Sequence, residues 1–260
     1  MRSMLDELRR AIFNKGFLLA IVLVFMMYFV DGNQALDEYT SVLTLLDSIT
    51  GLGAFTWVVP CVGALCYAGS YVREHDRGFA RYAVVRSGLG IYVFRRSVAV
   101  FISAFLAICL AISGYGLYAY TVCGKVFYGE LLGNYEPYAG FVSFYGLVVE
   151  GRYMQYIALH IMFHGLAAGM WAIFGLLLST IWKNNYVALF SPAIVVYFKD
   201  FVLARFSLLP NVTLKSLEMG ELYIEGVGRP IMLIIGVYLG MSLLFTAAVY
   251  WRLKRGIADV

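Results

Sequence analysis

Long apolar runs separated by short polar segments dominate the pattern along this chain. A hydrocarbon core of about 30 Å needs about 20 apolar residues per helix. Read with their flanks, six apolar runs predict transmembrane helices at about 17–30, 52–72, 91–122, 153–182, 186–204 and 230–250. The first run is short and is extended by the residues before it. The third and fourth exceed the required length, so we expect them to tilt or to project beyond the lipid.

The composition agrees with this pattern. Hydrophobic residues make up 62% of the chain and charged residues 14%, and the mean hydropathy is +0.78. Ordinary soluble domains are about 45–50% apolar and about 25% charged. We therefore expect an all-α integral membrane protein in which residues 1–260 form a single transmembrane domain.

The distribution of basic residues predicts how the chain is oriented. Six spans place both termini on the same side of the membrane. If that side is the cytoplasm, the inner segments hold fourteen of the twenty Lys and Arg residues. Cytoplasmic loops of membrane proteins are enriched in Lys and Arg. The sequence therefore predicts cytoplasmic N- and C-termini.

The N-terminal segment has the pattern of an amphipathic helix. Leu5, Leu8 and Ile12 fall on one helical face, and the charged residues lie off it. A helix of this kind lies in the plane of the membrane interface. We interpret it as an interfacial helix, although a positively charged tail is about equally compatible with the composition.

Residues 73–96 contain six of the twenty basic residues. Within them, 74–86 is predicted to be a helix with an apolar stripe of Phe79, Tyr82 and Ala83, while Arg77 and Arg81 line another face. An exposed apolar stripe on a charged helix indicates an interaction surface. The basic residues could instead act only as a topology signal, or the helix could lie on anionic lipid. We favour a docking surface for a soluble protein partner.

The sequence lacks the motifs of several enzyme classes. It contains no phosphate-binding loop of the form GxxxxGK[ST], so we do not expect the chain to hydrolyse ATP itself. It also contains no GxSxG or HExxH motif. We expect a protein that is not an enzyme and has no nucleic-acid partner.

Two histidines inside the fourth span are the main candidates for chemistry within the membrane. His160 and His164 lie four residues apart on one helical face and could share a metal ion. A catalytic metal normally has three protein ligands, and the remaining histidine, His75, lies on the inner side. We therefore expect a buried polar pair or part of a substrate path, and no metal. The alternative is an intramembrane metalloenzyme that uses His160 and His164.

Pairs of glycines four residues apart occur in two spans. They are Gly165 with Gly169 and Gly236 with Gly240. Small residues at this spacing let helices approach closely. The pairs predict close packing within the bundle or at a contact between two copies.

The order of these parts resembles the membrane subunits, or permeases, of ABC transporters of the type-2 exporter class. An amphipathic N-terminal helix is followed by a short first span and a second span that ends in Glu74. Gly78 comes four residues later, and a polar-to-apolar helix and a basic turn lead into the long third span. The chain departs from the family at two points. It has Ser87-Gly88-Leu89-Gly90 where the family often has a turn with Pro, and Arg95-Arg96 where the family often has Lys.

The resemblance implies a mechanism and a set of partners. Two six-span subunits would pair around a central path, each with an ATP-binding subunit on its cytoplasmic face. ATP and Mg would bind in that partner, and this chain would bind no cofactor. Glu74 would anchor the turn before the coupling helix, near Gly78. Phe79 and Tyr82 would fill a groove of the partner, with Arg77 and Arg81 beside them.

The cargo and the location are also expectations. Spans rich in aromatic residues, Met and Gly fit an amphipathic, peptide or lipid-like substrate, and export is implied by the resemblance alone. The resemblance also implies the plasma (cytoplasmic) membrane of a bacterium. The competing interpretation is a non-catalytic membrane scaffold or sensor that docks a different cytoplasmic partner through the same helix.

Overall fold

The computed structural model describes residues 4–35, 41–51, 53–127, 129–138, 144–202 and 228–258. These residues form helices and turns and contain no strand. The helices are α1 (Met4–Ile12), α2 (Lys15–Ala35), α3 (Val42–Gly51), α4 (Gly53–Tyr67), α5 (Ser70–Asp76), α6 (Phe79–Ser87), α7 (Leu89–Cys123), η1 (Gly129–Asn134), η2 (Glu136–Tyr138), α8 (Tyr145–Val149), α9 (Tyr153–Trp182), α10 (Asn185–Val202) and α12 (Gly228–Ala258).

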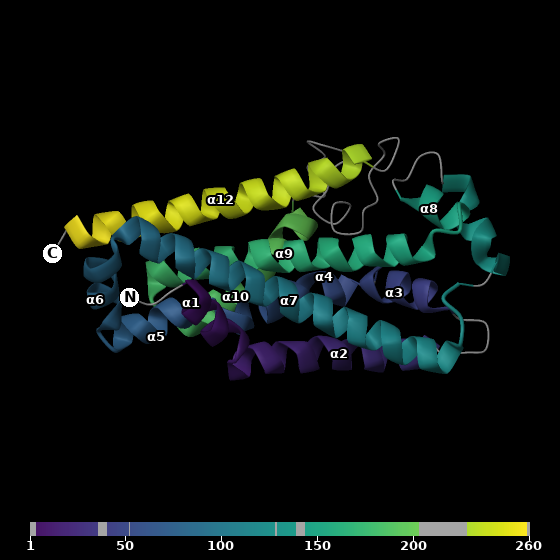
Figure 1. Cartoon of the computed structure of the whole chain (residues 1–260), viewed down its shortest axis with the longest axis horizontal. Coiled ribbons are helices and arrows are strands. Elements are labelled where there is room, and N and C mark those ends of the chain that lie inside the picture. The colour runs from purple at the N-terminus through teal and green to yellow at the C-terminus, as the bar shows by residue number, and fades with distance from the viewer. Residues whose placement is uncertain are drawn as a thin grey trace.

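The long helices run back and forth along one axis of the molecule (Figure 1). Four of them, α2, α7, α9 and α12, are long and apolar enough to cross a membrane. They coincide with the predicted first, third, fourth and sixth spans. The expected all-helical fold is therefore confirmed for the described residues, and four of the six predicted spans have the length and composition of membrane helices.

The other two predicted spans differ from expectation. The segment 52–72 is not one helix, because α4 ends at Tyr67 after 15 residues and α5 begins at Ser70. The turn between them abuts the start of α10: a Cβ atom on Gly69 would lie 2.5 Å from Asn185 Oδ1. The apolar part of α10 covers Asn185–Phe198, and residues 203–204 of the predicted span lie outside the described residues.

Helix α9 occupies the centre of the bundle. Its most apolar stretch is 72% buried, against 17% for α12, and it packs against α4, α7, α10 and α12. Close packing at Gly165 and Gly169 is confirmed, since added Cβ atoms would lie 2.6 Å from Cys109 Sγ and 2.7 Å from the Phe101 ring. Cβ atoms at Gly236 and Gly240 would meet nothing within 4 Å among the described residues.

The two ends of the bundle differ. Helices α1, α5 and α6 and the last turns of α12 gather at one end, which we call the α6 end, whereas α8 and the η helices lie at the other (Figure 1). The predicted apolar face of α1 is divided. Leu5 is 75% exposed, whereas Leu8 and Ile12 are partly buried against the core. Glu7 and Ala11 are the buried residues of this helix.

Candidate functional site

The basic segment 73–96 folds into two short helices and the start of α7. The single helix predicted at 74–86 is wrong, because the chain breaks at Arg77–Gly78 between α5 and α6. Gly78 has a φ of 71°, in the left-handed region that glycine tolerates best, and its N–H donates to the His75 carbonyl at 2.9 Å. Gly88, with a φ of 80°, is the C-cap residue of α6, and its N–H donates to the Val84 carbonyl at 2.9 Å. Helix α6 is therefore a separate element set between two glycine turns.

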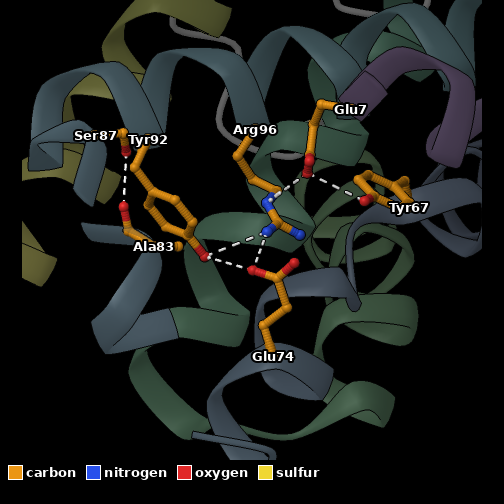
Figure 2. A network of polar contacts seen from close by, with 7 residues as sticks. All are labelled: Glu7, Tyr67, Glu74, Ala83, Ser87, Tyr92 and Arg96. Atoms are coloured by element: carbon orange, nitrogen blue, oxygen red, sulfur yellow. Dashed lines mark hydrogen bonds and ion pairs between the residues drawn. The ribbon is translucent and has the colours of Figure 1, made fainter. Parts of the chain in front are cut away.

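The α6 end is built around a buried ion-pair network (Figure 2). Arg96, on α7, is 4% exposed. Its Nε atom lies 3.2 Å from Glu7 Oε1 on α1, and its Nη2 atom pairs with Glu74 Oε2 on α5. Two tyrosine hydroxyls complete the network: Tyr67 donates to Glu7 at 3.1 Å, and Tyr92 donates to Glu74 at 3.2 Å. Four helices, α1, α4, α5 and α7, therefore meet at one guanidinium group.

We call this network the joint, because it holds several helices together. Its members are Arg96, Glu7, Glu74, Tyr67 and Tyr92. A buried charge is tolerated when it is paired and hydrogen-bonded, and removing one partner of a buried pair costs about 3–5 kcal/mol. The Arg96 guanidinium also lies 5.5 Å from the ring centre of Tyr67 and 5.3 Å from that of Tyr92, where ring quadrupoles attract a cation. The contacts fix α5 relative to α1 and α7, and so fix the base of α6.

Beyond this joint, α6 presents apolar side chains to its surroundings. Phe79 is 57% exposed, Tyr82 76% and Val85 87%. Ala83, predicted to belong to the same stripe, turns inward and packs with Val84 against the core. The exposed stripe is therefore Phe79, Tyr82 and Val85, which we call the α6 stripe.

A hollow lies between the α6 stripe and the joint. Its volume is about 330 Å³, and its walls include Phe79, Tyr82 and Ala83 from α6, together with Glu74 and Arg96. The residues that the resemblance implies for coupling thus lie close together. Gly78 lies in the turn before α6, and Arg77, the C-cap residue after α5, is exposed. The side chain of Arg81 lies outside the described part of the structure.

A second polar cluster lies inside the bundle, toward the α8 end. His160 and His164 are 5% and 4% exposed, and their ring centres are 4.4 Å apart. His164 Nδ1 donates to the His160 carbonyl at 2.8 Å. Asp47 on α3 brings a carboxylate oxygen to 3.8 Å from His160 Nδ1. Tyr156 donates a hydrogen bond to the same carboxylate at 3.1 Å.

The Asp47 carboxylate has one more donor. Tyr135, which follows η1, donates to Asp47 Oδ2 at 2.9 Å. Burial raises the pKa of the Tyr135 phenol, and the neighbouring Asp47 carboxylate raises it further, so this tyrosine stays protonated as a donor. Within the described ranges, no group of three or more His, Cys, Asp or Glu residues is placed to hold a metal ion. Both ring nitrogens of His160 lack a hydrogen-bond partner within the described ranges, so the cluster has buried polar atoms that could bind a polar group.

The charged residues of these two networks that sequence reasoning missed are Glu7, Asp47 and Arg96. Arg95 and Arg96 were expected in a basic turn, but the structure places both inside α7. Arg96 stands at the start of a long apolar helix, and an ionisable residue in such a helix usually has a specific partner. That signal was available. Nothing in the local sequence marks Glu7 or Asp47, because their partners lie 89 and 113 residues further along the chain.

Comparisons with known proteins do not assign a family. No model of a known protein family matches the chain, and no curated protein matches it.

Proposed function

We propose that this chain is the membrane subunit of an ATP-driven ABC transporter of the type-2 exporter class. The observation that carries the proposal is the α6 stripe. Phe79, Tyr82 and Val85 are exposed on a short helix whose base is fixed by a buried ion-pair network. An apolar surface on a rigid support favours a protein partner.

The proposal includes six membrane crossings. Helices α3 and α4 contain 10 and 15 residues and follow one another along the bundle (Figure 1). At 1.5 Å per residue they span about 37 Å together, which exceeds the roughly 30 Å of a hydrocarbon core. Together they can make the return crossing that neither makes alone. Helix α10 supplies the fifth crossing.

The orientation follows from charge. The segments assigned to the α6 end and to the inner connections hold fourteen of the twenty basic residues, so the positive-inside rule places this end in the cytoplasm. The ATP-binding partner is on that side. The chain has no phosphate-binding loop of its own, and ATP and Mg bind in the partner.

The mechanism uses the two turns that flank α6. Closure of the ATP-binding subunits pushes on the α6 stripe, and the Glu74–Arg96 pair carries the displacement to α7. A second copy of the membrane subunit completes a path for an amphipathic, peptide or lipid-like substrate. Rigid-body rocking of packed helices is an established way to alternate access. In this mechanism, the Asp47, His160 and His164 cluster contacts the substrate along that path.

The test is a comparison of two matched double variants. Phe79→Ser with Tyr82→Ser removes the aromatic part of the α6 stripe. Leu5→Ser with Phe13→Ser removes exposed apolar side chains from α1 and from the turn after it. Each protein is expressed in its native host and purified, and its ATP-binding partner and ATPase activity are measured. Buried aromatic anchors often contribute about 2 kcal/mol or more each to an interface. We expect the α6 variant to retain less than a tenth of the partner and the α1 variant to retain it.

Two outcomes would contradict the proposal. One is a stoichiometric partner without an ATP-binding motif, which would favour the scaffold or sensor interpretation. The other is equal retention of the ATP-binding subunit by both variants.

A further inference from the structure

A second hollow, which we call the arginine hollow, lies on the other flank of the joint. Its volume is about 400 Å³, and it is bounded by Arg10 of α1, Arg73 of α5, Arg77 in the turn after α5, and Glu74 and Arg96. Side chains from three helices that are distant in the sequence thus surround one space. The arrangement depends on the joint, since Arg96 and Glu74 belong to both.

More positively charged than negatively charged side chains surround the arginine hollow. Arg96 is already paired with Glu7 and Glu74. Arg10, Arg73 and Arg77 are exposed and have no carboxylate partner among the described residues. Two buried guanidinium nitrogens of Arg96, Nε and Nη1, meet no hydrogen-bond partner within the described ranges, although Nε is ion-paired with Glu7. The hollow therefore has an excess of positive charge and donors that remain to be satisfied.

We propose that the arginine hollow binds the phosphate of an anionic phospholipid from the inner leaflet. Guanidinium groups bind phosphate oxygens through paired, charge-assisted hydrogen bonds. Basic pockets between helices on the cytoplasmic side of membrane proteins are typical sites for anionic headgroups. Three unpaired arginines around one space match a phosphate better than they match a single carboxylate.

The surroundings of the arginine hollow place it at the level of the headgroups. Arg10 comes from α1, where Leu5 is 75% exposed, and Phe13 in the turn that follows is 82% exposed. Exposed apolar side chains beside basic ones are typical of a helix that lies in the membrane interface. The rings of Tyr67 and Phe79 form part of the wall and offer an apolar surface for the glycerol and the first methylenes of the lipid.

The inference rests on the orientation given in the proposed function and not on the ATP-binding partner. Arg77 and Phe79 line the arginine hollow and also belong to the coupling surface. A test that leaves both unchanged therefore separates the two proposals. Arg10 and Arg73 are available for this purpose, because neither belongs to the coupling surface.

The experiment measures the thermal unfolding midpoint of the purified full chain in a neutral detergent as short-chain phosphatidylglycerol is added. Short-chain phosphatidylcholine and inorganic phosphate are titrated in parallel. The test variant is Arg10→Gln with Arg73→Gln, and the matched control is Arg9→Gln with Arg252→Gln, which removes two exposed arginines outside the lining. Arg10→Lys with Arg73→Lys keeps the charge without the paired donors. Gel filtration and the midpoint without lipid report whether each variant folds.

We expect phosphatidylglycerol to raise the midpoint saturably and phosphatidylcholine to leave it unchanged. The apparent affinity should fall about ten- to thirty-fold in the Gln test variant, by less in the Lys variant, and by less than threefold in the control. Equal losses in the test and control variants would mean a general attraction to surface charge and would overturn the proposal. Stabilisation by inorganic phosphate as strong as that by phosphatidylglycerol would overturn the assignment to a lipid.

Discussion

Arg96 links α7 to carboxylates on two other helices. Its backbone belongs to α7, and its guanidinium group contacts carboxylates from α1 and α5. The Glu74 carboxylate is therefore already paired within the protein, and its side chain is 17% exposed. The resemblance implies that Glu74 anchors the coupling turn, and the contact with Arg96 supplies a physical means of anchoring. A loss of coupling in a Glu74 variant would consequently mix a structural effect with a functional one.

The first prediction concerns this joint. Arg96→Met removes the guanidinium and leaves two carboxylates, Glu7 and Glu74, without their cation. We expect a loss of about 3–5 kcal/mol in the free energy of unfolding, measured by denaturant titration in mixed micelles. Arg95→Met, one residue earlier and half-buried, is the control and should cost less than about 1 kcal/mol. A similar loss of unfolding free energy in both variants would show that the buried network does not cause the destabilisation.

The second prediction concerns Asp47. Its carboxylate accepts hydrogen bonds from Tyr135 and Tyr156, so Asp47→Ala leaves two buried hydroxyl donors without their acceptor. We expect a loss of about 1–3 kcal/mol in the free energy of unfolding. Glu150→Ala is the control at the same end, because Glu150 is exposed and its partner Arg152 is exposed too. An unchanged free energy of unfolding in the Asp47 variant would contradict the hydrogen bonds from Tyr135 and Tyr156 to Asp47.

At the scale of elements, the glycine turns before and after α6 determine where this helix begins and ends. Gly78 and Gly88 have positive φ angles, and an added Cβ at either would meet nothing within 4 Å. A larger side chain would therefore fit at both positions without a clash. Glycine is favoured there because the backbone φ angle is positive. The two turns let a nine-residue helix cross the end of the bundle between α5 and α7 (Figure 1).

The third prediction tests this requirement. Gly78→Ala forces a side chain into the left-handed region, and we expect it to cost about 1–2 kcal/mol in the free energy of unfolding. Gly90→Ala is the matched control. It lies inside α7, where an added Cβ has only an ordinary 3.9 Å contact with Tyr250, so it should be neutral or stabilise by about 0.5–1 kcal/mol. The same sign of change in both variants would contradict the role of the turn.

At the scale of the whole molecule, the arrangement of the helices constrains the topology. Helices α1, α5 and α6 and the last turns of α12 share one end of the bundle, and α2 and α7 are long enough to cross the membrane. If α2 crosses, the chain must return before α5, and only α3 and α4 lie between them in the described residues. The six-span proposal therefore requires both short helices to act in sequence.

The fourth prediction tests that topology by thiol labelling. A variant with its native cysteines replaced receives one new cysteine, by Arg77→Cys at the α6 end or by Arg152→Cys at the other. Both arginines are exposed. In sealed cells, a reagent that cannot cross the membrane should label the Arg152→Cys variant and not the Arg77→Cys variant until the cells are opened. The reverse pattern would contradict the proposed orientation. Labelling of both variants in sealed cells would show that no membrane separates the two positions.

The apolar pattern was sufficient to predict the four long helices, because a run of about 20 apolar residues has few alternatives to a membrane span. It did not predict the break at Ala68–Gly69, where the chain lies against Asn185 of a helix distant in the sequence. The α6 stripe was found in part: Phe79 and Tyr82 are exposed as expected, and Val85 replaces Ala83. The partners of Arg96 and His160 were beyond reach, since such pairings are decided by tertiary packing and leave no local pattern.

The distance along the chain between Glu7 and Arg96 has a consequence for biosynthesis. These residues are 89 positions apart, and at about 5–20 residues per second the ribosome needs roughly 4–18 s to pass from one to the other. During that interval, the Glu7 carboxylate lacks Arg96, which is its ion-pair partner in the folded chain. The ion pair between α1 and α7 can therefore form only after α7 is made, and a nascent chain stalled before residue 96 carries an N-terminal helix without this contact.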